Sequence, residues 1–287
     1  MKPVLCFGEV LWDAFGETKK AGGAPMNVAW HLKQQGAAVS FASSVGRDAS
    51  GDELADFLEQ SGLYSDLVQQ DDTLPTCEVT VQLDEHGHAT YIIPQPVSWD
   101  NIRVTDTLLN AARNASAIIF GSLACRGTQT RDTLHELLSE SNTLTVFDVN
   151  LRAPHYDRDT IHTLAARAHV VKMNEDEAEL LIGKGGDLKQ KIEEFHGTYH
   201  SQTICVTRGD KGAILWHDGK FYEHDGYPAH VVDTVGAGDS FLATLVAGLL
   251  NNESPDTILN RACRVGAYVA GQRGANPSYN IAEVEAL

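Results

Sequence analysis

The stretch DTVGAGDSFLATLVAGLL, residues 233–250, decides the fold, because a glycine-rich turn leads there into a strongly apolar helix. Apolar side chains recur at helical spacing after the turn, and the Asn pair at 251–252 is typical of a helix stop. In the GAG turn, residues 236–238, two glycines flank a small alanine and leave successive backbone N–H groups unobstructed. Together with the helix dipole, these groups predict an anion site with Asp239 beside the bound phosphate.

Asp239 has two interpretations in this setting. A carboxylate beside phosphate repels it, which is unfavourable unless the carboxylate takes a proton from an attacking hydroxyl, as phosphoryl transfer requires. Alternatively, Asp239 is an ordinary acid in the first turn of a helix, favoured by the helix dipole and without a chemical role. The local pattern leaves both interpretations open.

A second glycine turn, GGAPMN at residues 22–27, precedes another helical stretch. Pro25 suits a first helical position, and Asn27 is expected to face the same mouth as the GAG turn. With Asp13, which follows the first strand, this turn supplies neutral and acidic hydrogen-bonding groups without a cation. Such a set suits a polyhydroxylated ligand better than a phosphate. A connector in which Asn27 only caps the helix is the alternative.

The segment KMNEDE, residues 172–177, comes directly after an expected strand. Asn174 can cap a helix, and Glu177 follows three residues later, which is a capping-box spacing and explains both residues structurally. If a nucleotide lies nearby, the pair is also suited to orient Mg²⁺, directly or through its retained waters.

The segment TRGDKG, residues 207–212, lies at the end of another expected strand. Its glycines allow the backbone to approach a ligand closely, and Arg208 is suited to pair with phosphate. A hairpin turn without a ligand is the alternative.

Short β-branched runs alternate with helical stretches, which predicts an α/β fold with a mostly parallel central sheet flanked by helices. The expected strands are residues 4–8, 39–43, 117–120, 143–148, 169–172 and 203–207. The expected helices are near residues 25–35, 51–60, 105–113, 130–140, 159–168, 175–182 and 187–196. Strands this apolar on both faces suit the buried centre of a doubly wound sheet.

Two segments break this rhythm. Residues 75–93 predict two alternating strands joined by a turn at 84–87, and we interpret this hairpin as a lid or small sheet. Residues 212–223 predict a second hairpin, followed by a strand through 231–232 that leads into the GAG turn. No tandem repeat or low-complexity linker interrupts the sequence, so residues 1–287 are expected to form one domain with a lid.

The charge of the chain limits its partners. Asp and Glu total 39 against 22 Lys and Arg, which gives a formal net charge of -17 at pH 7. Such an acidic chain repels nucleic acid and anionic membrane surfaces, so neither is an expected partner. An anionic nucleotide would have to be held by local backbone N–H groups, a few cations and a metal ion.

The cysteines and the first residues bear on location. The five cysteines are widely scattered and form no CxxC pair, which predicts buried reduced thiols. The opening MKPVLCFGEVLWDAFG has a short apolar run interrupted by Glu9 and Asp13, which fits a first strand rather than a signal peptide or membrane span. A cytoplasmic location is therefore expected.

The four segments, in this order and at these separations, resemble the ribokinase-like (PfkB) family of carbohydrate kinases from residue 4 to about residue 277. DTVGAGDSF is a highly specific match to the C-terminal signature of that family, and residues 22–51 resemble its N-terminal one. The resemblance implies a ribokinase-like three-layer α/β fold with a small β lid, which often also carries homodimer contacts. It also implies ATP as co-substrate and a small sugar as acceptor.

The resemblance implies a role for individual residues as well. The catalytic base is Asp239, and the anion hole is the backbone of Gly236, Ala237 and Gly238, the last also contacting ATP. Sugar-contacting positions are Asp13, Gly23, Asn27, Asn150 and Arg152. Positions near ATP are Asn174, Thr207, Arg208 and Gly209. Asn174 and Glu177 match the NxxE element associated with Mg²⁺, and Asp233 with the 270–276 segment is a candidate site for a monovalent cation such as K⁺.

Three segments, GEVLWD at 8–13, FGSL at 120–123 and DVNLR at 148–152, resemble fructokinase members more than ribokinase or adenosine kinase members. D-fructose, phosphorylated at its terminal hydroxyl, is therefore the leading acceptor. Fructokinases usually have Pro where Val149 stands here, so 2-keto-3-deoxygluconate, ribose and nucleosides stay open as acceptors.

Two rival functions come from other classes. A non-catalytic sugar or nucleotide sensor on the same fold is the first, although the base, anion hole and metal element are all retained, which favours catalysis. A Rossmann oxidoreductase is the second, and it is disfavoured because no GxGxxG follows the first strand. The sequence also has no GxxxxGK[ST] P-loop, so a kinase must use another framework.

Overall fold

The computed structural model describes residues 3–15, 18–83 and 89–286. The strands of the large sheet are β1 (Val4–Phe7), β4 (Val39–Gly46), β5 (Val68–Asp71), β8 (Ala117–Gly121), β9 (Leu144–Asp148), β10 (Val170–Asn174), β11 (Thr203–Thr207), β12 (Ala213–His217) and β13 (Lys220–His224). Among the described residues they follow the order β13-β12-β11-β10-β9-β8-β1-β4-β5. Only the β11–β12 and β12–β13 pairs of this sheet are antiparallel. The predicted parallel centre is confirmed.

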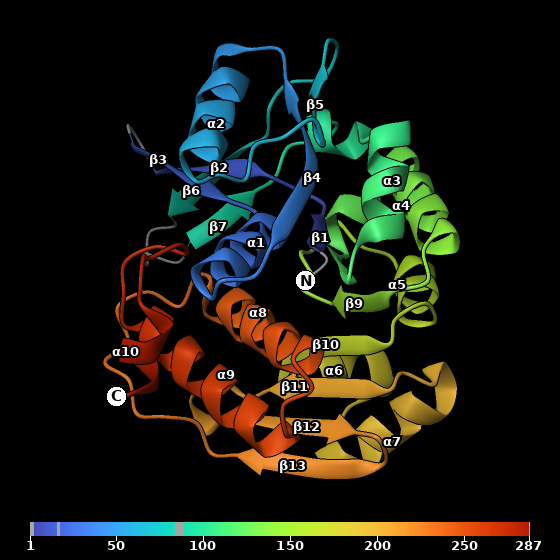
Figure 1. Cartoon of the computed structure of the whole chain (residues 1–287), viewed down its shortest axis with the longest axis vertical. Coiled ribbons are helices and arrows are strands. Elements are labelled where there is room, and N and C mark those ends of the chain that lie inside the picture. The colour runs from blue at the N-terminus through green and yellow to red at the C-terminus, as the bar shows by residue number, and fades with distance from the viewer. Residues whose placement is uncertain (1–2, 16–17, 84–88, 287) are drawn as a thin grey trace.

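Helices cover both faces of this sheet (Figure 1). One face carries α1 (Ala24–Gln34), α2 (Ala49–Gln60), α8 (Ala237–Leu250) and α9 (Pro255–Ala270). The other carries α3 (Asp106–Asn114), α4 (Thr128–Glu140), α5 (Arg158–Ala165), α6 (Glu175–Ile182) and α7 (Leu188–Tyr199). The remaining helical segments are η1 (Ser98–Asn101), η2 (Leu123–Arg126), η3 (Gly209–Lys211) and α10 (Ile281–Glu285).

Strand β1 is apolar at every position because both of its faces are buried. All four of its residues are buried, and successive side chains point to opposite faces. Leu5 and Phe7 join the hydrophobic cluster under α3 to α7, whereas Val4 and Cys6 join the cluster under α1, α8 and α9. The sheet is therefore the middle layer of three.

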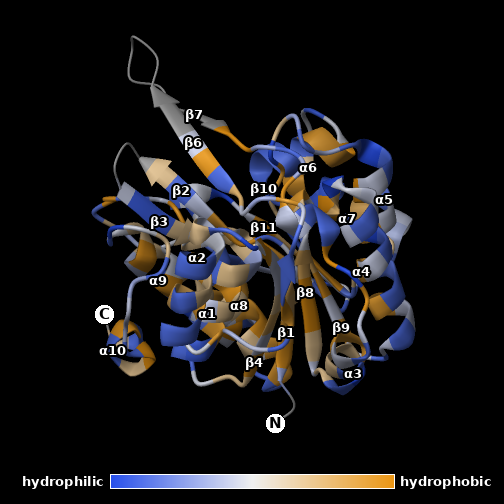
Figure 2. Cartoon of the chain, turned by 90° about the horizontal axis from the view of Figure 1, so that it is seen from above, coloured by the Kyte–Doolittle hydropathy of each residue, from blue (hydrophilic) through white to orange (hydrophobic). Residues whose placement is uncertain are grey.

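A second, smaller sheet has the order β3-β2-β6-β7 among the described residues. Its strands are β2 (Leu11–Phe15), β3 (Thr18–Gly22), β6 (Glu78–Leu83) and β7 (Ala89–Ile92). Figure 2 shows β6 and β7 extending away from the main sheet. The predicted hairpin at 75–93 is confirmed, while its predicted turn at 84–87 lies outside the described residues.

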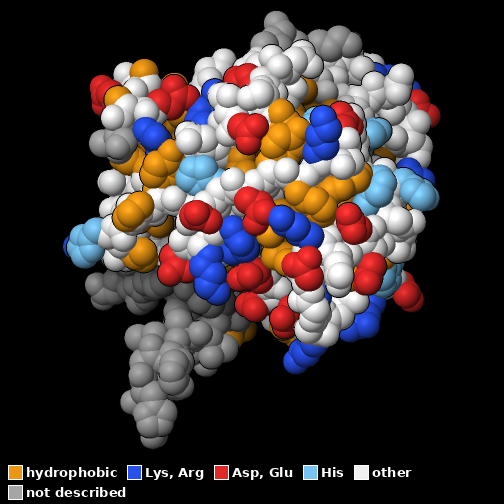
Figure 3. Space-filling view, turned by 90° about the horizontal axis from the view of Figure 1, so that it is seen from below, with side chains coloured by type: hydrophobic (Ala, Val, Ile, Leu, Met, Phe, Trp, Pro, Cys, Tyr) orange, Lys and Arg blue, Asp and Glu red, His pale blue; other side chains and the backbone are white. Residues whose placement is uncertain are grey.

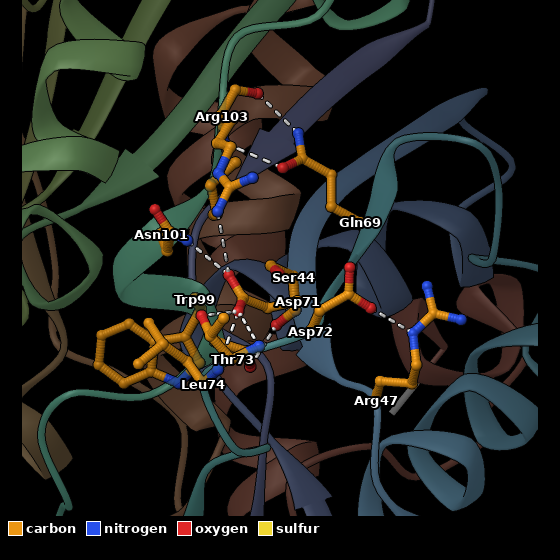
Figure 4. Close-up of polar contacts among 12 residues, drawn as sticks. Ser44, Arg47, Gln69, Asp71, Asp72, Thr73, Leu74, Trp99, Asn101 and Arg103 are labelled. Carbon is orange, nitrogen blue, oxygen red and sulfur yellow. Dashed lines mark hydrogen bonds and ion pairs between the residues drawn. The ribbon is translucent and has the colours of Figure 1, made fainter.

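The carboxylate of Asp71 fixes the chain where it leaves β5 toward the small sheet (Figure 4). It accepts hydrogen bonds from the backbone N–H groups of Thr73 and Leu74, both at 2.8 Å, and from the side-chain amide of Asn101 at 2.5 Å. Burial acts to raise the pKa of Asp71, but a hydrogen bond of 2.7 Å from the Thr73 hydroxyl and the three bonds above outweigh it and lower the pKa to about 2. The connection therefore depends on an ionised carboxylate.

The predicted strand at Val231 and Val232 is wrong. Strand β13 ends at His224, and the two valines lie in an irregular segment with 57% and 49% of their surface exposed. The N–H of Val232 donates to the carbonyl oxygen of Ala270, at the end of α9, rather than to a strand. The backbone of this β-branched pair is bonded to the end of a helix rather than to a strand, and a strand requires a partner strand.

The surface and the thiols complete the description. On the face shown in Figure 3, Lys and Arg side chains lie among Asp and Glu side chains and exposed apolar groups. All five cysteines are buried and free, as predicted. Among the residues that the structure describes, no helix has the length and apolar character needed to cross a bilayer.

Candidate active site

Polar side chains gather at the carboxyl edge of the large sheet. Glu9 follows the end of β1, Asp148 is the last residue of β9, Asn174 is the last of β10, and Thr207 is the last of β11. Because β1, β8, β9, β10 and β11 run parallel, these strand ends share one edge. The order reverses at β1, whose neighbours are β8 and β4, and such a switch point favours ligand binding.

The GAG turn lies at the N-terminus of α8, as predicted. Gly236 caps the helix with φ of 81°, a left-handed conformation that favours glycine. A Cβ atom on Gly236 would lie 2.5 Å from the carbonyl oxygen of Ala275, so the close approach of these two backbones also requires glycine. The first N–H groups of α8 have no partners within the helix and suit an anion, although the N–H of Ala237 donates to the carbonyl oxygen of Thr234 at 3.3 Å.

Asp239 lies half-buried in the first turn of α8. Its Oδ2 accepts a hydrogen bond of 2.7 Å from Nδ2 of Asn27, and Oδ1 of Asn27 accepts one of 3.0 Å from Nδ2 of Asn276. Burial raises the pKa of Asp239, and the charge of Lys172, the Asn27 hydrogen bond and the charge of Arg152 oppose the rise. The carboxylate is therefore oriented by an amide and faces two cations.

Lys172 and Asp148 form a buried ion pair next to this turn. Nζ of Lys172 lies 3.1 Å from Oδ1 of Asp148, and the two side chains are 8% and 4% exposed. Burial acts to lower the pKa of Lys172, but the charges of Asp148, Glu177 and Asp239 outweigh burial and raise it. One buried ammonium group thus interacts electrostatically with three carboxyl groups.

Glu9 and Asp13 are two further carboxyl groups with raised pKa values. Glu9 is 2% exposed, and its burial raises the pKa to about 7, against the opposing effects of a backbone N–H and Arg152. Burial raises the pKa of Asp13 to about 6, with Arg152 and Lys20 opposing. Oε2 of Glu9 has no hydrogen-bond partner among the described residues, so it is an unsatisfied acceptor beside the site.

The predicted capping box at the start of α6 is confirmed. Oδ1 of Asn174 accepts from the N–H of Glu177 at 2.8 Å, and Oε2 of Glu177 accepts from the N–H of Asn174 at 2.9 Å. Oε1 of Glu177 also accepts from the N–H of Leu151 at 2.8 Å, which ties the loop after β9 to α6. A pocket of about 280 Å³ lies here, lined by Leu151, Arg152, Ala153, Tyr156, Asn174, Asp176, Glu177 and Leu180.

The loop after β9 carries two of the predicted sugar-contacting residues. Asn150 has φ of 38°, in the left-handed region that is unusual for a residue with a side chain. Its carbonyl oxygen accepts from Oγ of Ser122 at 3.4 Å. Arg152 is exposed, and its charge opposes the rise in the pKa values of Glu9, Asp13 and Asp239 that burial causes. The loop therefore places the guanidinium group of Arg152 near these three carboxyl groups.

Asp233 contacts the C-terminal segment with which it was predicted to act. Its Oδ2 accepts from the N–H of Gly274 at 3.0 Å, and its Oδ1 accepts from the N–H of Val235 at 3.1 Å. Arg208, in contrast, directs Nη2 to the carbonyl oxygen of His224 at 3.4 Å. The turn after β11 thus holds Arg208 against β13.

The structure brings Asp13, Asn27, Arg152 and Asp239 together, and Gly23 completes this group. A Cβ atom on Gly23, whose φ is 114°, would lie 2.4 Å from the carbonyl oxygen of Glu9. Gly23, Asn27 and Asp239 were predicted from the glycine turns, Asp13 from its place after the first strand, and Arg152 from the family resemblance.

The sequence analysis gave no role to Glu9, Asp148 or Lys172. Their signal is a charged residue inside or directly after an otherwise apolar strand, as in HVVKMN at 169–174. Burying such a charge is unfavourable unless the charge has partners, so its presence points to a site.

Comparison with known proteins gives the same picture. The pfkB family of carbohydrate kinases matches residues 3–282. A fructokinase from Salmonella typhimurium is 30% identical over 269 residues, which cover 88% of this chain and 87% of the relative. The structure of fructokinase from Xylella fastidiosa with bound ATP has a TM-score of 0.87 at 22% identity, covering 98% of this chain and 97% of that one.

A second solved structure is a double mutant of fructokinase from Vibrio cholerae O395, in a form with fructose, ADP and a potassium ion bound. Its TM-score is 0.84 at 23% identity, and the match covers 100% of this chain and 98% of that one. The predicted three-layer α/β fold with a small second sheet is confirmed.

Proposed function

Because this chain belongs to the pfkB family of carbohydrate kinases, we propose that it transfers the γ-phosphoryl group of Mg-ATP to the terminal hydroxyl of D-fructose. The observation that carries this proposal is the position of Asp239, which lies in the first turn of α8 beside the GAG turn and bonds to Asn27. A carboxylate next to a phosphate site is what phosphoryl transfer to a hydroxyl needs.

In this proposal Asp239 is the general base. It accepts the hydroxyl proton while the hydroxyl oxygen forms a bond to the γ-phosphorus and the bond from that phosphorus to ADP breaks. The backbone N–H groups of Gly236, Ala237 and Gly238 stabilise the charge that develops on the phosphoryl oxygens. The hydrogen bond from Asn27 orients the base toward the acceptor.

The sugar is proposed to lie between the small sheet and the large one. Asp13 comes from β2, Gly23 and Asn27 come from the start of α1, and Asn150 and Arg152 come from the loop after β9. These groups offer carboxylate and amide acceptors together with amide and guanidinium donors, which suits a ring of hydroxyl groups.

The nucleotide is proposed to lie along the ends of β10 and β11, near Asn174 and the turn from Thr207 to Gly209. The residues present fit a magnesium ion, because Asn174 and Glu177 supply amide and carboxylate oxygens beside the 280 Å³ pocket. Both residues already accept backbone hydrogen bonds, so we expect them to hold Mg²⁺ through its water ligands. When bound, Mg²⁺ would offset the charge of the β- and γ-phosphates.

A monovalent cation is proposed beside Asp233. Its carboxylate already bonds to Gly274 and Val235, which brings it to the segment that packs on the anion turn. The Vibrio cholerae structure with a potassium ion supports K⁺ as the ion to test.

Fructose as the acceptor is supported by the curated relatives, several of which are named fructokinases. The test is ADP release from Mg-ATP over fructose, ribose, 2-keto-3-deoxygluconate, adenosine, glucose and mannose. We expect turnover with fructose at the highest kcat/KM. A higher kcat/KM for another member of the panel would overturn fructose, and turnover with none of them would favour an untested acceptor or a non-catalytic sensor.

A further inference from the structure

We infer that Lys172 is a positioning residue for phosphoryl transfer, whose buried ammonium group lies against the backbone of the GAG turn and favours the ionised form of the Asp239 carboxylate. The inference rests on the proposed function, because it assigns Lys172 to the same reaction. Lys172 acts through the base and is not proposed to touch the sugar.

The sheet register places this ammonium group. Lys172 on β10 and Asp148 on β9 are Cα partners in a parallel pair, so their side chains leave the same face side by side. The resulting ion pair of 3.1 Å holds the ammonium group in one place. A Cβ atom on Gly238 would lie only 3.1 Å from Nζ of Lys172, so the ammonium group lies against the backbone of the GAG turn.

Packing alone does not explain a lysine at this position. Its neighbours Val171 and Met173 on β10 are fully buried apolar residues, and an apolar pair in place of a buried ion pair is often equally stable or more stable. The ion pair with Lys172 also leaves part of the Asp148 carboxylate without a partner. Oδ2 of Asp148 is buried without a hydrogen-bond partner among the described residues.

Charged and polar groups from four directions face Asp239. Lys172 on β10, Arg152 in the loop after β9 and Asn27 on α1 favour its ionised form. Glu9 after β1 and Asp148 at the end of β9 face it with carboxyl groups of their own, and the charge of Asp239 raises the pKa values of both.

The two cations differ in their exposure to water. Arg152 is exposed, so water and salt screen its charge, whereas Lys172 is 7% exposed and is screened much less. Lys172 is therefore the cation that acts most strongly on Asp239.

This placement matters because a base must be ionised before it can accept a proton. With Lys172 neutral or absent, Glu9 and Asp148 would face Asp239 against a weaker positive charge. A larger fraction of Asp239 would then be protonated near neutral pH, and the acid limb of the activity profile would move to higher pH.

The test uses Asp148→Asn and the double variant Lys172→Met with Asp148→Asn, because neither leaves a buried carboxylate at position 148 unpaired. The carboxyl group of Asp239 is titrated by ¹³C NMR in the free protein, with Asp239→Asn to assign its signal. We expect the pKa of Asp239 to be lower in Asp148→Asn than in the wild type. In the double variant we expect it to be higher than in Asp148→Asn by about one unit or more.

The pH profile of kcat/KM, measured with the best sugar of the panel, should show the same displacements of its acid limb. A role for the ion pair in folding alone predicts that loss of either partner has the same effect and that the Asp239 titration is unmoved. Equal Asp239 titrations in the single and double variants would overturn the inference. An absence of turnover in the wild type would instead overturn the proposed function, and the NMR titration separates these two failures.

Discussion

Nδ2 of Asn27 donates a hydrogen bond of 2.7 Å to Oδ2 of Asp239, although the two residues are 212 positions apart in the chain. The bond joins α1 to α8, the two helices that begin at the two glycine turns. The proposed sugar-binding turn and the proposed base therefore form one hydrogen-bonded unit. A shift of either helix would change the position of both groups.

Replacing Asp239 with Asn should remove the proposed base while keeping the shape of the side chain. We expect turnover to fall by about 10²–10⁴-fold, the usual contribution of a general base. ATP binding, measured by calorimetry, should remain nearly intact. Turnover at the wild-type level in this variant would show that Asp239 is not the base.

Removing Mg²⁺ with excess chelator should abolish activity. The proposed site contributes backbone N–H groups and few cations, which do not offset the charge of the β- and γ-phosphates without a metal ion. Coupled-assay rates before chelation, after chelation and after added Mg²⁺ are the measurement. Full activity in chelator is the contrary result.

Gly236→Ala should destabilise the protein and impair nucleotide binding. The added Cβ atom would lie 2.5 Å from the carbonyl oxygen of Ala275, and φ of 81° is unfavourable for alanine. We expect a loss of about 1–3 kcal/mol in the free energy of unfolding, measured with denaturant. Gly197→Ala is the matched control, because Gly197 lies in α7 with open space around it, and it should stabilise by roughly 0.5–1 kcal/mol. Equal effects of the two changes would contradict the strain argument.

Glu9→Gln should change how stability depends on pH. The pKa of Glu9 is raised by burial from 4.5 to about 7, so between these values the native state holds a proton that the unfolded state has released. Wild-type stability therefore falls as pH rises through this window. We expect Glu9→Gln to match the wild type near pH 4 and to exceed it by about 3 kcal/mol at pH 8. Denaturant curves at both pH values decide, and a difference that is the same at both would refute the shift.

Asp71→Asn should show the opposite dependence. The pKa of Asp71 is lowered from 3.8 to about 2, so its ionised form stabilises the fold above pH 4, and this stabilisation is lost as pH falls toward 2. We expect a loss of about 1–2 kcal/mol at pH 7 that disappears near pH 2. Asp72→Asn is the control, because its ion pair with Arg47 is exposed, and it should cost less than about 1 kcal/mol. Equal losses in the two variants at pH 7 would be the contrary outcome.

Local patterns in the sequence predicted the elements that depend only on residues close together in the chain. The apolar strands of the large sheet, the GAG turn before α8 and the Asn174–Glu177 capping box depend on neighbouring residues, and all are present. Strand β3, with the sequence TKKAG, was missed because its exposed side chains carry no apolar alternation. It is a strand only because β2 lies beside it.

In the candidate site, too, some residues could be predicted from local patterns and others could not. Asn27 and Asp239 follow glycine turns and were found from them, whereas Asp13, which was expected after the first strand, lies within β2. The ion pair of Lys172 with Asp148 depends on the register of two strands, which no local pattern fixes. The strand expected at residues 231–232 failed for the converse reason, since a suitable local sequence found no partner strand.

The chain of hydrogen bonds from Asn276 through Asn27 to Asp239 has a consequence for biosynthesis. Asn276 and Asn27 are 249 positions apart, and Asn276 supplies the outer amide of this chain. During translation α1 emerges early, but the amide that orients Asn27 is added only after all of α9 has been synthesised. A nascent chain therefore carries an incomplete centre until Asn276 has been added.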